Sequence, residues 1–180
     1  MNRTRAVWVL VVVALAALFA GLWLAIQRYS PNASGASAEP FFSQTFKDLD
    51  GHSQAMTQWE GQLVVVNFWA TWCPPCVEEM PDLQRIHDEY RRQGVTVVGL
   101  GIDSPSALRR FRDDHKLALP LYAAGAAGSE LGKALGNASG ALPYTLLIDR
   151  KGRIVRAHLG QIRPAELRRW LDAQLGPRSR

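Results

Sequence analysis

The chain has 180 residues, a formal net charge of +5 and two cysteines. This length is enough for one domain with a substantial core and not obviously enough for two. The basic clusters, such as Arg109, Arg110 and Arg112, fall on predicted helices that also carry acidic residues. Such mixed charge is typical of a solvated helix face and does not indicate nucleic-acid binding.

Residues 6–26 form an uncharged apolar run that predicts a transmembrane helix. A helix of this length spans about 31 Å, close to the thickness of a hydrocarbon core of about 30 Å. The alternative is a cleaved signal peptide, because Ala36-Ser37-Ala38 resembles a small-residue cleavage site. The apolar core of a signal peptide runs only about 7–15 residues, which favours the retained anchor. Arg3 and Arg5 precede the run, so the positive-inside bias places residues 1–5 in the cytoplasm.

Under both interpretations, the rest of the chain is exported from the cytoplasm. Residues 27–40 are rich in Ser, Ala, Pro and Gly and are predicted to be a flexible tether. We expect a folded domain over 41–176 and a short tail over 177–180. With a retained anchor, the protein is a single-pass protein of the cytoplasmic (inner) membrane whose domain faces the periplasm or the cell exterior. With cleavage, it is secreted to the periplasm.

The first predicted elements are a hairpin, a buried strand and a helix. Asp50-Gly51 is a strong hairpin signal between two short mixed runs. Residues 63–69 are almost continuously apolar and β-branched, which is typical of a central strand covered on both faces. A helix is expected from about Cys73, with a kink at Pro81 and an end at Gly94.

The second half alternates in the same way and then ends in a hairpin and a helix. A buried strand is predicted over 95–103, and Ser104-Pro105 provides a cap and a first-turn proline for the next helix. The remaining elements are a short strand within 118–124, a helix over 129–136, paired strands over 144–149 and 153–159, and a helix over 164–175. Alternation predicts parallel strands, and the hairpins add antiparallel ones. The fold class is therefore α/β, with a mixed central sheet flanked by helices.

Cys73 and Cys76 lie at the junction of the 63–69 strand and the following helix. A structural zinc site needs four ligands, and the four histidines show no ligand spacing. A structural disulfide gains most by closing a long loop, and this one would close only a few residues. A redox couple remains the favoured interpretation.

The expected geometry gives each cysteine a distinct role. Unpaired N–H groups and the helix macrodipole at the start of a helix stabilise a thiolate at Cys73. Cys76, almost one turn further and more buried, would resolve the mixed disulfide that Cys73 forms with a substrate. Pro74 and Pro75 occupy positions whose N–H groups have no partner within the helix.

The segments FWATWCPPC, EEMP, LPYTLLIDRKGRIV and HLG together resemble the thioredoxin superfamily. More narrowly, they are similar to the membrane-anchored TlpA/ResA-type thiol–disulfide oxidoreductases of bacteria. The resemblance covers about residues 41–175. It implies a thioredoxin-like fold with an N-terminal β-hairpin extension and a central β-α insertion over about 117–136, and such additions shape partner recognition in this family.

The resemblance also implies how a substrate is bound. It assigns Pro143 as a cis-proline that faces the cysteine pair, and Leu142 as the residue whose backbone meets an extended substrate segment. Trp72, Pro74 and Pro75 complete the expected substrate-binding surface. From the sequence alone, Pro143 could equally be a proline at the start of a strand.

A carboxylate for proton transfer is expected at Glu79. Thioredoxin carries a buried aspartate in the strand before its cysteines, and the matching residue here is Asn67, which cannot accept that proton. The resemblance offers Glu79, one helical turn past Cys76, as the base for the resolving thiol. The alternative is that Glu79 is a solvated helix residue like its neighbour Glu78.

The expected activity is the reduction of disulfides in exported proteins. The resemblance implies a membrane electron donor of the DsbD/CcdA kind, and clients such as the haem-site cysteines of apocytochrome c or other exported thiols. No cofactor and no metal are expected. A peroxidase of related fold would want Thr three residues before its cysteine, where this chain has Ala70. A thiol-based metallochaperone or other binding module stays open, because two thiols suffice for two-coordinate Cu(I).

Overall fold

The computed structural model describes residues 12–13, 17, 21 and 35–176. Contacts divide the chain into two units, Met1–Pro31 and Asn32–Arg180. The N-terminus (1–5), most of the predicted membrane helix (6–26), the first part of the tether and the tail (177–180) lie outside the described residues, so they stay predictions. Within the described residues, no helix has the length and apolar character that crossing a bilayer requires.

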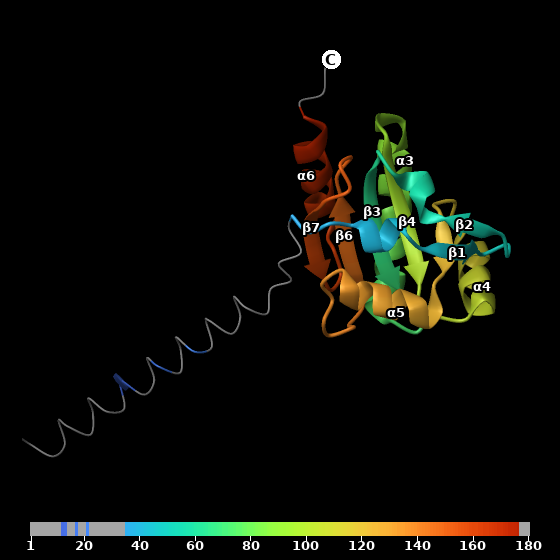
Figure 1. Ribbon diagram of the computed structural model, residues 1–180. Coiled ribbons are helices and arrows are strands. Elements are labelled where there is room, and N and C mark those ends of the chain that lie inside the picture. Colours follow the sequence, from blue (N-terminus) through green and yellow to red (C-terminus); the bar gives the residue numbers. More distant parts are fainter. Residues whose placement is uncertain (1–11, 14–16, 18–20, 22–34, 177–180) are drawn as a thin grey trace, which may run out of the picture. The chain divides into compact units, whose positions relative to one another are not determined.

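A seven-stranded mixed sheet forms the centre of the second unit, in the order β2-β1-β5-β4-β3-β6-β7 (Figure 1). Strands β3, β4 and β5 pair in parallel. On one side β6 pairs antiparallel with β3 and β7 antiparallel with β6, and on the other side β1 pairs antiparallel with β5 and β2 antiparallel with β1. The predicted mixed sheet and both predicted hairpins are therefore confirmed. The strands are β1 (Thr45–Asp48), β2 (Ser53–Ala55), β3 (Leu63–Trp69), β4 (Val95–Gly101), β5 (Leu121–Ala123), β6 (Tyr144–Ile148) and β7 (Ile154–Leu159).

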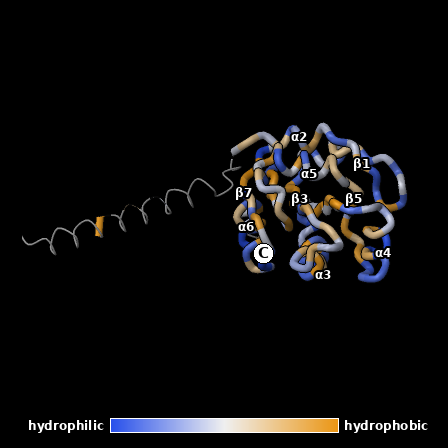
Figure 2. Tube along the Cα trace, turned by 90° about the horizontal axis from the view of Figure 1, so that it is seen from below, coloured by the Kyte–Doolittle hydropathy of each residue, from blue (hydrophilic) through white to orange (hydrophobic). Residues whose placement is uncertain are grey.

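Helices cover both faces of this sheet, as Figure 2 shows with the strands between two helical layers. On one face lie α3, α4 and α6, and on the other lie α2 and α5. Two 3₁₀ helices, η1 and η2, follow β2 and α3. The helices are α2 (Glu39–Phe42), η1 (Met56–Trp59), α3 (Pro74–Tyr90), η2 (Arg91–Gln93), α4 (Pro105–His115), α5 (Gly125–Ala134) and α6 (Pro164–Leu175).

The two central strands explain why the core has two halves. Every residue of β3 and of β4 is buried, and the strands pair in parallel from Leu63 opposite Val95. Side chains alternate between faces along a strand. Val65 and Trp69 accordingly join the core beneath α3, α4 and α6, whereas Val64 joins the core beneath α2 and α5. A continuous apolar run is what a strand buried on both faces needs.

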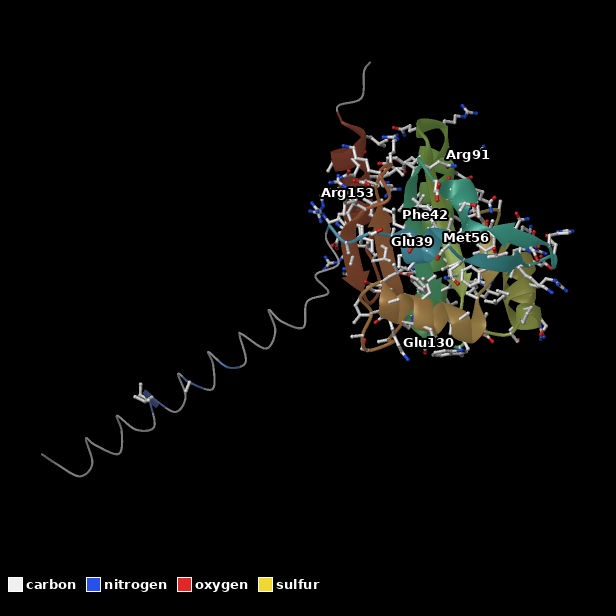
Figure 3. The ribbon with its side chains drawn as sticks, viewed as in Figure 1. Glu39, Phe42, Met56, Arg91, Glu130 and Arg153 are labelled. Atoms are coloured by element: carbon white, nitrogen blue, oxygen red, sulfur yellow. A yellow bond between two sulfur atoms is a disulfide. The ribbon has the colours of Figure 1, made fainter. Side chains whose placement is uncertain are left out.

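The folded domain begins before residue 41, so the predicted boundary of the tether is placed too late. Ser37 forms an antiparallel bridge with Arg153, and Ala38 is fully buried with its N–H donating to Gly152 O at 2.8 Å. The short helix α2 follows at once and was not predicted. Its Phe42 packs with Met56 of η1 in the same core, and Figure 3 marks both side chains.

The remaining helices follow the sequence pattern closely. The Ser104 side chain accepts the N–H of Ala107 at the start of α4, which confirms the predicted cap. Helix α3 is continuous through Pro81 but ends at Tyr90, and the 3₁₀ helix η2 lies between it and the predicted end at Gly94. Helix α5 begins at Gly125, four residues before the predicted start, and with β5 it lies within residues 117–136, where the central β-α insertion is expected.

Candidate active site

Cys73 and Cys76 form a disulfide at the point where β3 gives way to α3. Cys73 is the N-cap of α3, and its carbonyl accepts the first helical hydrogen bond from Val77 N at 3.1 Å. Pro74 and Pro75 fill the first helical positions, where a missing N–H costs nothing and a fixed φ suits the helix. The sequence thus builds the strand-to-helix junction and places both sulfurs at it.

The two cysteines differ in accessibility. Cys73 is 5% exposed, whereas Cys76 is fully buried in the first turn of the helix. Beside them, Trp72 projects into solvent with 66% of its surface exposed. This is the order of outer and inner cysteine that the sequence predicted.

The loop that carries Cys73 is fixed from the neighbouring strand. The N–H and the hydroxyl of Thr71 both donate to Oδ2 of Asp103, just after β4, and Oδ1 of Asp103 accepts the N–H of Ser104 at 2.6 Å. Sequence reasoning missed Asp103. Its signal was a carboxylate at the end of the predicted strand 95–103, the parallel neighbour of β3, because parallel strands end at the same edge of the sheet.

Strand pairing brings Leu142 and Pro143 to the same edge. β6 runs antiparallel to β3 with Tyr144 opposite Phe68, so the residues before β6 lie beside the end of β3. The Leu142–Pro143 peptide bond is cis, as the resemblance implied. Pro143 is buried, and the half-buried Leu142 packs against the core that contains both cysteines.

Glu79 is a buried carboxyl one turn along α3 from Cys76. It is only 1% exposed, so the alternative of a solvated residue is wrong, and its neighbour Glu78 is the exposed one. Burial raises the pKa of Glu79 to about 7, although the N–H of Ile162 at 2.9 Å and Nδ2 of Asn67 at 2.7 Å partly oppose that rise. The carboxyl can therefore exist in either protonation state near neutral pH.

Two uncharged residues complete the surroundings of Glu79. Asn67 on β3 and Thr145 on β6 are directly opposed in the sheet, and Nδ2 of Asn67 lies 3.0 Å from Oγ1 of Thr145. Both are fully buried. Sequence reasoning named Asn67 but missed Thr145, whose signal was a polar residue inside the apolar strand 144–148. It also missed Ile162, which acts through its backbone N–H and leaves no side-chain signal.

The next feature is the arrangement of side chains that could bind a metal ion. Among the described residues, no group of three or more His, Cys, Asp or Glu side chains is arranged to hold an ion. The histidines make local contacts instead. His52 pairs with Asp48, His87 accepts the N–H of Val97, His115 stacks on Phe111, and His158 contacts Gln161 O.

Known proteins are similar to this chain in sequence and in fold. Residues 33–172 match the Redoxin family. A thiol-disulfide oxidoreductase ResA of Halalkalibacterium halodurans is 29% identical over 164 residues, covering 89% of this chain and 90% of that protein. A protein of the same name from Bacillus cereus is 32% identical over 127 residues, covering 69% and 70%.

A solved structure supports the fold. A thiol:disulfide interchange protein of the thioredoxin family from Chlorobium tepidum superposes with a TM-score of 0.68 at 23% identity, covering 79% of this chain and 97% of that one. The architecture is therefore thioredoxin-like. Together with the sequence matches, this shows that the chain belongs to the Redoxin family and is a ResA-like thiol–disulfide oxidoreductase of the thioredoxin superfamily.

Proposed function

We propose that Cys73 and Cys76 are the redox couple of this enzyme and that it reduces disulfides in exported proteins. The observation that carries the proposal is the pair itself. Two cysteines joined by a disulfide stand at the start of a helix, the outer one 5% exposed and the inner one fully buried. A buried carboxyl lies one turn further along the same helix.

The reaction proceeds by two exchanges. The thiolate of Cys73 attacks one sulfur of the substrate disulfide, the substrate S–S bond breaks, and the other substrate sulfur leaves as a thiolate. Cys76 then attacks Sγ of Cys73, which breaks the mixed disulfide and releases the second substrate thiol. The dithiol supplies two electrons, and the enzyme ends as the Cys73–Cys76 disulfide, the form that the structure contains.

Position explains why Cys73 attacks first. The N-terminal end of a helix carries unpaired N–H groups and a partial positive charge, which stabilise an anion at the N-cap. Pro74 and Pro75 have no N–H, so Cys76 supplies the first amide donor of α3. The thiolate is the reactive form of cysteine, and Cys73 is also the more accessible of the two.

Glu79 takes the proton of Cys76 in the second exchange. Residues three apart on a helix are neighbours on its surface, so Glu79 lies on the same face of α3 as Cys76. A base works best when its pKa lies near the working pH, and burial brings the pKa of Glu79 to about 7. Deprotonation raises the fraction of Cys76 that can attack.

The substrate lies across Trp72, Pro74, Pro75, Leu142 and Pro143. These residues gather at the edge of the sheet where β3 ends and β6 begins. The exposed indole of Trp72 offers apolar contact area, and the backbone of Leu142 offers hydrogen bonds to an extended segment. Any exported disulfide with flexible flanking chain fits this description.

Electron supply and location complete the proposal. Exported compartments are oxidising, so a reductase there must be recharged continuously. A membrane donor of the DsbD/CcdA kind would do this, and an anchor helix over residues 6–26 would hold the domain near it. Clients of this kind include apocytochrome c and other exported proteins whose cysteines must stay reduced.

The test is catalysis by the purified full-length chain. With dithiothreitol as electron source, the protein should accelerate reduction of a protein disulfide such as that of insulin. Cys73→Ser and Cys76→Ser should each abolish catalytic turnover, and Gly132→Ala on the opposite face should retain it. An inactive wild-type protein that instead binds Cu(I) tightly would overturn the proposal in favour of a metal-binding module.

A further inference from the structure

Glu79, Asn67 and Thr145 form a polar group inside an otherwise apolar layer. Asn67 and Thr145 point from β3 and β6 to the face that α3 covers, among core residues such as Val65 and Leu147. One amide nitrogen, Nδ2 of Asn67, lies within hydrogen-bond distance of Oε1 of Glu79 (2.7 Å) and Oγ1 of Thr145 (3.0 Å). The other end of the amide, Oδ1, is buried and has no hydrogen-bond partner among the described residues.

This arrangement satisfies only the ionised form of Glu79. A carboxylate accepts hydrogen bonds and donates none, and here Oε1 accepts from Asn67 while Oε2 accepts from the N–H of Ile162. When Glu79 gains a proton, one of these oxygens becomes a donor. The Ile162 N–H belongs to the backbone and cannot reverse, so the proton belongs on Oε1, where it meets Nδ2 of Asn67.

We propose that the side-chain amide of Asn67 rotates by half a turn whenever Glu79 is protonated, which makes Asn67 the positioning residue for proton transfer at Glu79. In the ionised state Nδ2 donates to Oε1. In the protonated state Oδ1 takes its place and accepts the proton on Oε1. The inference rests on the proposed role of Glu79 as base for Cys76, and it names how the surroundings of that base adapt.

The rotation keeps the hydrogen-bond count unchanged. The two ends of an amide have nearly the same shape, so the rotation needs no repacking. The hydroxyl of Thr145 can accept from Nδ2 in one orientation and donate to Oδ1 in the other. In the ionised state Nδ2 faces Glu79 and Thr145, and Oδ1 lies where there is no hydrogen-bond partner among the described residues. In the protonated state the two ends exchange places. A hydroxyl beside an amide is therefore what both states require.

No electron moves in this step. Under the proposed function, the proton leaves Sγ of Cys76 and arrives at Oε1 of Glu79, while the amide turns. Adjacent elements contribute few titratable groups: α3 contributes Cys76, and β7 contributes His158, which lies opposite Thr145 in the sheet and contacts Gln161 O of the Gln161–Ile162 peptide. β3 and β6 contribute Asn67 and Thr145, which carry no charge.

Nuclear magnetic resonance of the oxidised full-length protein in detergent tests the rotation directly. The protein is labelled with ¹³C in glutamate side chains and ¹⁵N in asparagine side chains. In the wild type, the carboxyl carbon of Glu79 should titrate, and the Asn67 amide signals should shift with the same midpoint. Nuclear Overhauser effects from the Nδ2 protons to the Thr145 side chain should be present above that midpoint and lost below it.

Two variants and a matched control separate rotation from mere packing. Asn67→Leu keeps the approximate volume and removes the donor, so the Glu79 midpoint should rise. Asn67→Asp replaces the amide by a second carboxyl, so the two groups should titrate in two coupled steps. Asn137→Leu alters a second buried asparagine of the described residues, which donates to Ala141 O, and should leave the Glu79 midpoint unchanged.

Nuclear Overhauser effects that persist unchanged while Glu79 titrates would overturn the proposal. So would a Glu79 carboxyl that does not titrate between about pH 5 and pH 9. Because the cysteines stay oxidised throughout, this result does not depend on whether Glu79 serves Cys76. A Glu79→Gln variant whose thiol reactivity keeps the wild-type pH profile would refute the base role alone and leave the measured rotation intact.

Discussion

The buried carboxyl of Glu79 lowers the free energy of unfolding near pH 7, which is the pH range in which it can act as a base. Its pKa is about 7 in the folded protein and 4.5 when unperturbed, because burial disfavours the charge. Between these values the folded protein keeps the proton that the unfolded chain has lost. Its contribution to stability is therefore fully present below pH 4.5 and is lost as pH rises through 7.

Glu79→Gln should remove this dependence. At 1.36 kcal/mol for each pKa unit, the wild-type free energy of unfolding should fall by about 3 kcal/mol across the window, apart from other titrating groups. The variant should lack that fall. Chemical denaturation of the oxidised protein at a series of pH values measures both. Glu78→Gln, an exposed change in the same turn, is the control and should keep the wild-type slope; a Glu79→Gln protein with that slope would contradict the assignment.

Trp72 should matter for substrates and little for folding. Its side chain is 66% exposed, so Trp72→Ala should change the free energy of unfolding by no more than about 0.5 kcal/mol. If the indole contacts substrate, its loss should remove at least about 1 kcal/mol of binding, a fall of about fivefold in kcat/KM. Steady-state kinetics with a protein disulfide checks this, and unchanged kinetics would remove Trp72 from the substrate surface.

At this scale the sequence predicted the residues whose side chains carry a recognisable pattern. The spacing of Cys73 and Cys76 indicated the redox pair without the family resemblance, whereas Glu79 was identified only through that resemblance. Helical spacing places Glu79 on the face of Cys76, but its burial could not be predicted, because a carboxyl is rarely buried without partners and its partners lie on other segments. Ile162 could not be found either, since its contribution is a backbone N–H and any residue but proline offers one.

The elements around the site follow from burial on two faces. β3 and β4 were predicted almost to their ends because strands covered on both sides need unbroken apolar runs. α2 was missed because four residues are too few for a helical period to show. Its packing comes from Phe41 and Phe42, which the sequence alone could not place against the sheet.

Helix α5 offers a matched pair of glycine substitutions. A Cβ at Gly132 would meet only ordinary contacts, the nearest being 3.6 Å from Phe68, whereas at Gly128 it would lie 2.6 Å from the Cβ of Ala124. Gly132→Ala should stabilise the protein by about 0.5–1 kcal/mol through better helix propensity. Gly128→Ala should destabilise it through overpacking. Thermal unfolding measures both, and equal effects of the two changes would contradict the packing described for α5.

The whole chain assembles the site from segments far apart in sequence. Asn67, Glu79, Thr145 and Ile162 come from a strand, a helix, a second strand and a loop. Local patterns predicted each element, but only the antiparallel pairing of β6 with β3 and the return of the chain towards α6 bring them together. Tertiary contacts of this kind leave no periodic signal in a sequence.

Location is tested at the scale of the full chain. If residues 6–26 are a retained anchor, the protein expressed in a bacterium should stay with the membrane fraction after an alkaline wash, and removal of residues 1–34 should release the domain. Mass spectrometry of the product reports its N-terminus. A soluble exported form that begins after Ala38 would contradict the anchor and establish the cleaved signal peptide.

The order of attack is the central claim, and trapping tests it most directly. Cys76→Ser leaves Cys73 able to attack a substrate disulfide but removes the thiol that would release it. The reduced variant, incubated with a disulfide-containing protein, should accumulate a mixed disulfide that peptide mass spectrometry maps to Cys73, and Cys73→Ser should accumulate none or far less. Adducts that form preferentially through Cys76 in the Cys73→Ser protein would contradict the account.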